Sequence, residues 1–405
     1  MTDRLYYDDP YLTVFDAHIA RVDREHERTL ITLERTAFYP TSGGQPHDTG
    51  RLASTTVVDV FETAAGDLAH VVSGDSANLA TGAIVSCAID WDRRFDHMQQ
   101  HTGQHVLSAS FDRLLRVPTK SFHLGNERST IDLAREISDD EARQAEADAN
   151  RIVWENRPVV IRYVDGSDVA TLPLRKASTR SGRIRLIDID RHDLSACGGT
   201  HVARTGGVGA VVITNVERHK AGSRVEFVCG AREVRVMRDV LDSVSRSIRL
   251  LSVLPAELPA SIERLQADHR AAVRSVDELR STLAGHDAAR LATRAVTVES
   301  VPIVCEVSEA DDEAIKQIAG LVATEQGMAA VLVANRVPCF VVAASPDGRL
   351  LDASDVIREL VGRVGGRGGG KPRLAQAGGI DADADRVLAA AREAVASVIR
   401  ARPTT

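Results

Sequence analysis

Two short segments combine side chains that commonly bind transition metals. One is His-Thr-Gly-Gln-His at residues 101–105, where two imidazoles stand four residues apart. On a helix this spacing places both on one face, one turn apart, so that they can reach the same ion. The other is Cys-Gly-Gly-Thr-His at residues 197–201, whose glycines allow a turn that brings a thiolate and a third imidazole together. Three imidazoles and one thiolate suit zinc. We therefore predict a Zn²⁺ site formed by His101, His105, Cys197 and His201.

A histidine pair with this spacing also has an ordinary interpretation. Such a pair by itself more often lies on a surface or in a core than at a metal, and the added Cys-x3-His segment is what favours ligation. His97 lies one turn before His101 and is a further candidate that would replace or supplement a ligand. We rank it behind the other four.

The composition of the chain indicates a multi-domain protein without a membrane-spanning segment. The chain has 405 residues, of which 43% are hydrophobic, enough for two or three domains with proper cores. The five cysteines are scattered, and no apolar run reaches the roughly 18 residues of a membrane-spanning helix. We expect a cytoplasmic protein with no membrane partner. The net charge of -7 argues against coating of nucleic acid by bulk positive charge, so any RNA contact must come from local basic patches.

The site must be positioned by a mixed α+β fold. Short strand-like runs at residues 29–33, 57–61 and 84–89 predict a small β-barrel or sandwich in residues 1–90. In residues 91–230 the sequence predicts two helices, at 95–111 and 138–156. It also predicts strands at 159–164, 184–189 and 208–213. The first of these helices would carry residues 101–105.

Two further regions follow. Residues 231–294 are poor in glycine and predict a helical arm, broken at Pro255 and Pro259. Its apolar seam has positions alternately four and three apart, namely Leu258, Ile262, Leu265, His269, Ala272, Val276, Leu279 and Leu283. Residues 295–405 predict a C-terminal α/β domain with buried strands at 329–334 and 339–343, followed by a glycine-rich run at 362–371.

The motifs resemble those of a known family. His-x3-His followed roughly 90 residues later by Cys-x3-His looks like the editing domain shared by alanyl-tRNA synthetases, threonyl-tRNA synthetases and AlaX proteins. The Gly-Gly-Gln loop at residues 38–50 and the glycine motif at 366–372 resemble segments of the alanyl enzymes and AlaX proteins, and the threonyl enzymes are not expected to carry them. The chain thus resembles a long-form AlaX-type editing protein with a DHH-associated C-terminal domain. Gly103 departs from the family, which more often has a small residue with a side chain there.

The resemblance implies an activity. The substrate would be the ester that joins a wrongly attached serine or glycine to the terminal ribose of alanine tRNA, cleaved with the help of zinc. Residues before 36 leave no room for an ATP-using aminoacylation domain, so we expect editing without charging. If all four residues bind the ion, its tetrahedral shell is closed, whereas three ligands would leave a place for water. The list of candidate ligands does not distinguish these two cases. The alternatives are editing of seryl-threonine tRNA, or a zinc-stabilised RNA-binding protein without hydrolysis.

The same resemblance suggests roles for the Gly-Gly-Gln loop. Gln45 is expected to donate a hydrogen bond to the substrate or to the developing oxyanion, and Thr41, Gly43 and Gly44 are expected to contact the substrate. The alternative is a tight turn that needs a positive φ at the two glycines.

A second segment, at residues 120–123, lies where the family places residues near the aminoacyl group. Either of two residues in this segment would bind the serine hydroxyl and so favour serine over alanine. They are Ser121, which is a catalytic candidate, and His123, which is a substrate-binding candidate. The alternative is that both are surface residues of a strand.

Partners are expected from the basic patches and the arm. The local clusters are residues 180, 183 and 185, residues 218–220 with 224, and residues 363, 367, 371 and 373. Arg363, Arg367 and Lys371 are predicted to bind RNA, with the acceptor end and the elbow of alanine tRNA as partners. The alternatives are a solvated surface or a flexible linker. The helical arm or the C-terminal domain is expected to pair two chains in a homodimer.

Overall fold

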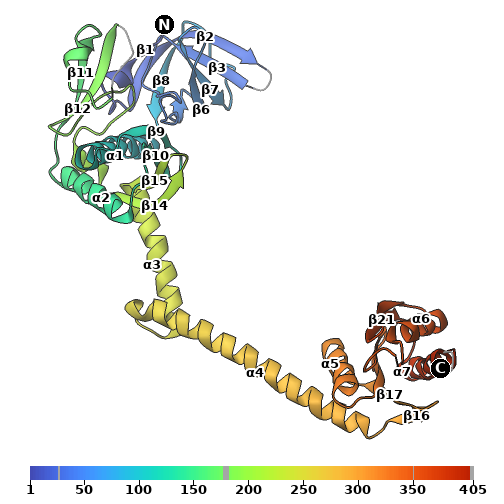
Figure 1. The fold of residues 1–405 in the computed structure, drawn as a ribbon. Coiled ribbons are helices and arrows are strands. Elements are labelled where there is room, and N and C mark those ends of the chain that lie inside the picture. Colours follow the sequence, from blue (N-terminus) through green and yellow to red (C-terminus); the bar gives the residue numbers. More distant parts are fainter. Residues whose placement is uncertain (26–27, 177–181, 350, 402–405) are drawn as a thin grey trace. The chain divides into compact units, whose positions relative to one another are not determined.

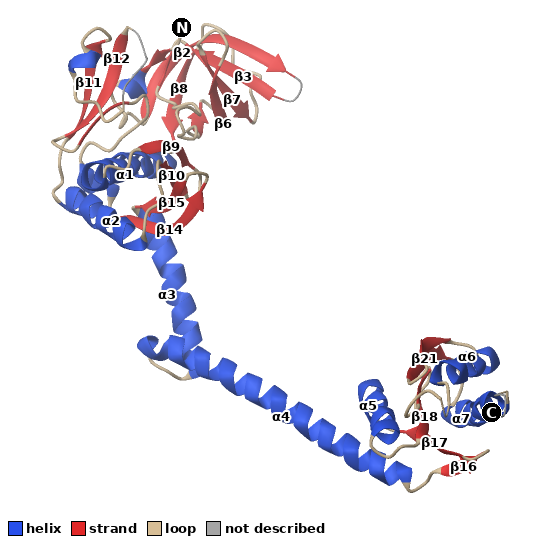
Figure 2. Ribbon diagram, in the orientation of Figure 1, coloured by secondary structure: helices blue, strands red, loops and turns tan. Residues whose placement is uncertain are grey.

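The computed structural model describes residues 1–25, 28–176, 182–349 and 351–401. It confirms a mixed α+β fold, and it divides into two compact units, Met1–Ser247 and Ile248–Thr405 (Figures 1 and 2). The finer division of the chain at residues 90, 230 and 294 stays a prediction.

The first unit opens with a closed, antiparallel six-stranded barrel, which confirms the barrel interpretation over a sandwich. Its strands, in order around the barrel, are β2 (Val14–Glu25), β3 (Arg28–Leu33), β7 (Leu68–Ser73), β6 (Thr55–Glu62), β5 (Gly50–Leu52) and β8 (Ile84–Ile89). Side chains along β6 and β8 largely alternate between the interior and the surface, as the period of two in a strand requires. A short parallel pair, β1 (Asp3–Arg4) and β4 (Arg35–Thr36), is followed on its first strand by the 3-10 helix η1 (Leu5–Tyr7).

Helix α1 (Trp91–Leu115) is the central element of the unit and carries the predicted histidine pair. Asp90 caps its first turn by accepting a hydrogen bond from the Arg93 amide. Every residue from 98 to 111 is buried, so the helix is enclosed on all sides despite its many polar side chains. Several of those side chains find partners inside. The Gln100 amide, for example, bonds both backbone groups of Cys229.

A four-stranded antiparallel sheet and helix α2 (Asp139–Trp154) lie beside α1 (Figure 1). The strands in order are β14 (Val211–His219), β15 (Gly222–Cys229), β10 (Ser129–Leu133) and β9 (Thr119–Leu124). Helix α2 begins with a capping box between Ser138 and Glu141. Strand β14 starts three residues later than predicted, because the 3-10 helix η3 (Thr205–Val208) occupies the preceding residues and Gly209 then turns the chain with a φ of +84°.

A three-stranded sheet precedes the second predicted metal-binding segment. It consists of β11 (Val159–Asp165), β12 (Arg183–Ile189) and β13 (Asp193–Ala196), with the 3-10 helix η2 (Val169–Thr171) between the first two. Strand β13 ends immediately before Cys197. A buried ion pair between Arg94 of α1 and Asp48 ties the helix to the loop that carries Gln45.

Two helices occupy the predicted helical region, with an interruption near Pro255, whereas Pro259 lies within the second helix. Helix α3 (Ala231–Leu251) spans the boundary of the two units, and α4 (Leu258–Ala292) follows the 3-10 helix η4 (Pro255–Glu257). Pro255 and Pro259 stand in first turns, where a missing amide proton costs no helical hydrogen bond. From Ile262 to Leu283 the seam is exposed, and its pairing with another chain stays a prediction.

The second unit ends in a six-stranded mixed sheet with helices on both faces. The strands in order are β16 (Val296–Val298), β17 (Val301–Ser308), β18 (Ala329–Ala334), β19 (Cys339–Ala344), β21 (Leu374–Ile380) and β20 (Arg367–Lys371). One face packs on α5 (Asp312–Thr324) and the end of α4, and the other on α6 (Ala353–Val364) and α7 (Ala384–Arg400). Half of the glycine-rich run is therefore strand β20 rather than a linker. Of the helices that the structure describes, none has the length and apolar character needed to cross a membrane.

Candidate metal centre

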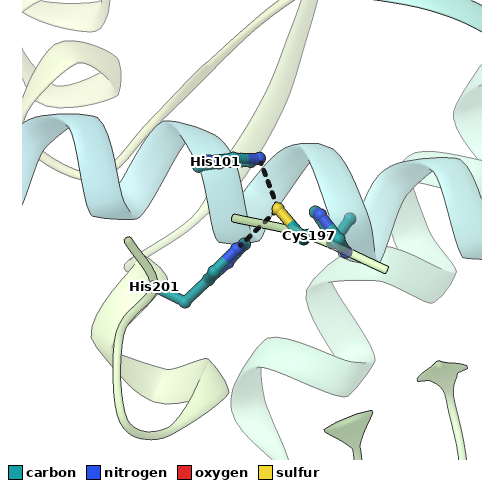
Figure 3. Close-up of side chains that lie close together, drawn as sticks. His101, Cys197 and His201 are labelled. Atoms are coloured by element: carbon teal, nitrogen blue, oxygen red, sulfur yellow. Dashed lines mark hydrogen bonds between the residues drawn. The ribbon is translucent and has the colours of Figure 1, made fainter. Parts of the chain in front are cut away.

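The four predicted ligands come together although almost 100 residues separate the two segments. His101 and His105 project from α1, Cys197 follows β13, and His201 lies in the loop before η3. The Cys197 Sγ atom is 3.4 Å from Nε2 of His101 and 3.4 Å from Nε2 of His201 (Figure 3). One ligand atom from each of the four residues lies within 4.8 Å of all the others.

This donor set fits a zinc ion. In a tetrahedral zinc shell, neighbouring nitrogen and sulfur ligands are about 3.5 Å apart, close to the 3.4 Å found between Sγ and two of the imidazoles. The three imidazoles are buried and the thiol is half-buried, as expected for an ion site with limited access to water. His97 is not part of this group. It is 1% exposed, and burial, together with the charge of Arg93, lowers its pKa to about 3.

Each imidazole is held through its Nδ1 atom by an oxygen of a neighbouring side chain. Nδ1 of His101 is 2.7 Å from Oε1 of Gln45, and Nδ1 of His105 is 2.7 Å from a carboxylate oxygen of Asp193. Nδ1 of His201 is 3.2 Å from the Thr102 hydroxyl. Because Gln45 and Asp193 offer acceptors, His101 and His105 donate from Nδ1, which leaves Nε2 of each ring as the atom that a metal would bind in place of a proton.

Asp193 connects the metal centre to the wall of a pocket. Its carboxylate is fully buried and accepts hydrogen bonds from His105, from Nε of Arg175 at 2.6 Å and from the Ser195 hydroxyl at 3.0 Å. Burial alone would raise the pKa of Asp193, but His105 and Arg175 lower it below its usual range. Asp193 was not among the predicted site residues. Its only signal in the sequence is an acidic residue four positions before Cys197.

Gln45 links the two predicted metal-binding segments through hydrogen bonds. It is completely buried, its Oε1 accepts from the Thr200 amide at 3.1 Å, and its Nε2 donates to the Thr200 hydroxyl at 2.8 Å. Its amide therefore holds both His101 and the loop that contains His201. The donation from Gln45 to a substrate oxyanion stays a prediction, and Nε2 would have to leave Thr200 to make it.

Charges within the cluster favour a thiolate. Burial by itself raises the pKa of the Cys197 thiol, but His101 and His201 outweigh it, and the pKa is lowered well below its usual range. Burial, with a contribution from His101, lowers the pKa of His201 to about 3. Burial likewise opposes protonation of His105, but the hydrogen bond to Asp193 raises its pKa to about 9. A thiolate among imidazoles is the form of cysteine that binds metals.

Glycines at two positions allow the close packing of the centre. A Cβ atom at Gly199 would lie 2.2 Å from Cε1 of His101, so a side chain there would displace the ligand. At Gly103, the departure from the family, a Cβ atom would lie 2.3 Å from Sγ of the buried Cys229. The Cys229 side chain thus fills the space that a side chain at position 103 would need.

A pocket of about 420 Å³ opens beside the metal centre. Its lining includes His101, His105 and Cys197 together with Gln104, Gly43 and Ser121. Basic side chains of Lys120, Arg175 and Lys176 also border it. The pocket therefore joins the candidate ligands to a positively charged rim.

Among the described residues, the pocket lining does not include three of the predicted substrate contacts, which are Thr41, Gly44 and His123. The Thr41 hydroxyl is 3.0 Å from Nδ1 of His47, and His123 is exposed on β9. Gly43 and Gly44 have φ values of +55° and +82°, as in the tight turn considered from the sequence. Ser121 lines the pocket, but its hydroxyl donates to Asp132 at 2.7 Å.

The predicted RNA-binding residues differ in their surroundings. Arg363 forms ion pairs with Glu359 and Glu393, while Arg367 and Lys371 are exposed on strand β20. Of the first basic cluster, Arg185 is 7% exposed and donates to the carbonyls of Cys197 and Gly199, so it supports the metal-binding loop. Arg180 lies outside the described residues.

Three family models match separate segments of the chain. Residues 184–226 match the family model described as "Threonyl and Alanyl tRNA synthetase second additional domain", residues 300–399 match the DHHA1 domain, and residues 5–93 match "tRNA synthetases class II (A)". The C-Ala domain from Aquifex aeolicus alanyl-tRNA synthetase aligns with 25% of this chain over 97% of its own length, at 19% identity and a TM-score of 0.23.

Whole relatives extend the similarity. The alanine–tRNA ligase of Pyrococcus furiosus is 32% identical over 391 residues, which cover 93% of this chain and 42% of the ligase, so the chain spans less than half of that enzyme. The alanyl-tRNA editing protein AlaX-L of Pyrococcus horikoshii is 30% identical over 407 residues, covering 98% of this chain and 99% of the relative. The chain belongs to the AlaX-L family of alanyl-tRNA editing proteins.

Proposed function

We propose that this protein is an editing hydrolase that removes serine and glycine from wrongly charged alanine tRNA by zinc-dependent ester hydrolysis. The observation that carries the proposal is the cluster of three buried imidazoles and the half-buried Cys197 thiol, of which His101, His105 and Cys197 line the pocket. Membership of the AlaX-L family supports alanine tRNA as the substrate.

The residues of the centre have distinct tasks in this proposal. His101, His105, Cys197 and His201 would hold the ion. Bound zinc would supply Lewis-acid chemistry suited to ester hydrolysis. Asp193 and Gln45 keep the Nε2 atoms of His105 and His101 directed at the ion, and the buried position of the cluster limits the access of bulk water.

The rim of the pocket supports binding of an RNA end. Lys120 and Lys176, beside Arg175, place positive charge near the candidate ligands, where phosphates of the acceptor end would approach. Arg175 is fixed in this position by its ion pair with Asp193. The pocket is therefore suited to a small aminoacyl group attached to an anionic strand.

The second unit supplies the proposed partner surfaces. Arg367 and Lys371 on β20 would contact the tRNA elbow, and the exposed seam of α4 would pair two chains in a homodimer. Light scattering at micromolar concentration tests the homodimer. A monomeric mass would contradict it.

Hydrolysis of defined substrates tests the proposed function. Serine release would be measured from alanine tRNA and from threonine tRNA, beside alanine release from alanine tRNA. Rapid loss of serine from alanine tRNA alone is the expected result. Equal loss from threonine tRNA would favour editing of that tRNA instead. Zinc-bound, folded protein that releases no amino acid would leave RNA binding as the function.

A further inference from the structure

The pocket wall contains a buried polar atom without a hydrogen-bond partner. Oε1 of Gln104 has none, although Gln104 is only 2% exposed. Within the described part of the chain, several other buried side-chain atoms also lack a partner, but Gln104 is the residue among them that lines the pocket. It stands on α1 immediately before the candidate ligand His105.

The rest of the Gln104 amide is anchored. Its Nε2 donates to the Ser108 hydroxyl at 2.8 Å, and Ser108 also accepts from Thr119, another residue of the pocket lining, at 2.8 Å. Turning the amide by 180° would exchange its two atoms, and Nε2 would then lack a partner. Either orientation leaves one polar group unpaired. Leaving such a group unpaired when it is buried costs free energy, so a ligand that pairs with it gains affinity.

We infer that Gln104 recognises the side-chain hydroxyl of the aminoacyl group and makes the site prefer serine over glycine and alanine. The inference rests on the proposed function and adds the residue that discriminates. A hydroxyl both donates and accepts, so it pairs with the free amide atom in either orientation. The methyl group of alanine would leave that atom buried and unpaired. Rejection through an unpaired polar group is an effective form of discrimination.

Gln104 is better placed for this role than the residues considered from the sequence. The Ser121 hydroxyl already donates to Asp132. Arg224 also donates to this carboxylate, through Nε and Nη2. His123 is exposed and outside the pocket lining given by the described residues. Gln104 is buried, anchored on one side and unpaired on the other.

The test compares three aminoacyl esters. Values of kcat/KM would be measured for seryl-, glycyl- and alanyl-tRNA of the alanine type, with the wild type, Gln104→Met and Gln104→Glu. Methionine keeps the length of the side chain and removes the acceptor. Glutamate keeps one oxygen to accept from Ser108 and one to accept from the substrate. The matched control is Gln100→Met, because Gln100 is equally buried on α1 but bonds the Cys229 backbone instead of lining the pocket.

We expect Gln104→Met to lower the ratio of seryl to glycyl kcat/KM by roughly 10- to 100-fold, almost entirely through the seryl substrate. Gln104→Glu should keep most of the wild-type ratio, and Gln100→Met should leave it unchanged even where it lowers stability. Equal losses on seryl and glycyl esters would mean that Gln104 binds the common amino group or only supports α1, and would overturn the inference. An unchanged ratio would do the same. A wild type that hydrolyses none of the esters would instead remove the proposed function, and the inference with it.

Discussion

At the scale of single residues, the candidate ligands depend on neighbours that hold each imidazole by Nδ1. Asp193 is the most connected of these neighbours, because it binds His105, Arg175 and Ser195 at once. A carboxylate behind a metal-binding histidine fixes its tautomer and its orientation. The carboxylate thus belongs to the metal centre as much as to the pocket.

Replacing Asp193 should therefore weaken zinc binding. We expect Asp193→Ala to lower zinc affinity by roughly 10- to 100-fold, since His105 loses the acceptor that orients it. Ser195→Ala is the matched control, because it removes one bond to Asp193 and keeps the bonds to His105 and Arg175. Competition with a chelator of known affinity measures both variants. Equal zinc affinities in the folded proteins would contradict this role for Asp193.

A second residue-scale prediction concerns Gly103 and Cys229. Gly103→Ala should lower the free energy of unfolding by about 1–3 kcal/mol, because its Cβ would overlap the Cys229 sulfur. Adding Cys229→Ala removes that sulfur and should restore most of the loss. Both tryptophans, Trp91 and Trp154, lie in the first unit, so urea unfolding followed by their fluorescence reports on this unit. Additive effects of the two substitutions would argue against a direct clash.

The cluster of candidate ligands could be predicted from the sequence, whereas the residues that support it could not. Residue type and spacing restrict His101 and His105 to one face of a helix, and Cys197 and His201 to one turn. Asp193, Thr102 and Gln104 differ in no local pattern from ordinary polar residues. Their roles arise from contacts between distant segments, which spacing does not encode.

At the scale of elements, buried polar groups also join the strands of the barrel. His70 of β7 is completely buried, with Nδ1 at 2.9 Å from the Ile31 carbonyl and Nε2 at 2.9 Å from the Thr36 hydroxyl. Burial lowers the pKa of His70 to about 4, from about 6.5 in an unfolded chain. The fold therefore favours the neutral imidazole.

This shift predicts a loss of stability in mild acid. The contribution of neutral His70 is complete above pH 6.5 and is lost as the pH falls from 6.5 toward 4, by about 3 kcal/mol at most. His70→Asn should remove that part of the pH dependence, and His18→Asn, at an exposed histidine of the same barrel, should not. Unfolding free energies from tryptophan fluorescence at pH 7, 5.5 and 4.5 measure the difference. Parallel curves for wild type and His70→Asn would contradict it.

Strand β20 allows a prediction about RNA. Arg367→Gln with Lys371→Gln should weaken tRNA binding and lower the slope of log affinity against log salt by about 2, because two phosphate contacts are lost. Arg363→Gln should change the slope less, since the Arg363 guanidinium is already paired with Glu359 and Glu393. Filter binding at several salt concentrations measures the slopes. An unchanged slope for the double variant would place the tRNA elsewhere.

The elements that could be predicted are those with local signals. Strand and helix patterns predicted three of the six barrel strands (β3, β6 and β8), α2 and the helical region around Pro255. The surroundings of α1 could not be predicted in this way. Its polar side chains carry no marked apolar face, yet residues 98–111 are all buried, because Gln100, Arg94 and others find partners only in the assembled unit.

At the scale of the whole molecule, the chain combines a unit that contains the candidate metal centre with a unit that contains the proposed tRNA and dimer surfaces. The proposal assigns hydrolysis to the first unit alone. Variants in the second unit should therefore act on substrate affinity, and variants of the ligands on the chemical step.

The most direct test of the central claim is a zinc titration. Serine release from alanine tRNA would be measured on chelator-treated, folded protein as zinc is added back, with bound zinc per chain determined in parallel. Our account predicts almost no release without the metal, a linear rise with zinc, and a plateau at one zinc per chain. Full activity of the folded, zinc-free protein would contradict it.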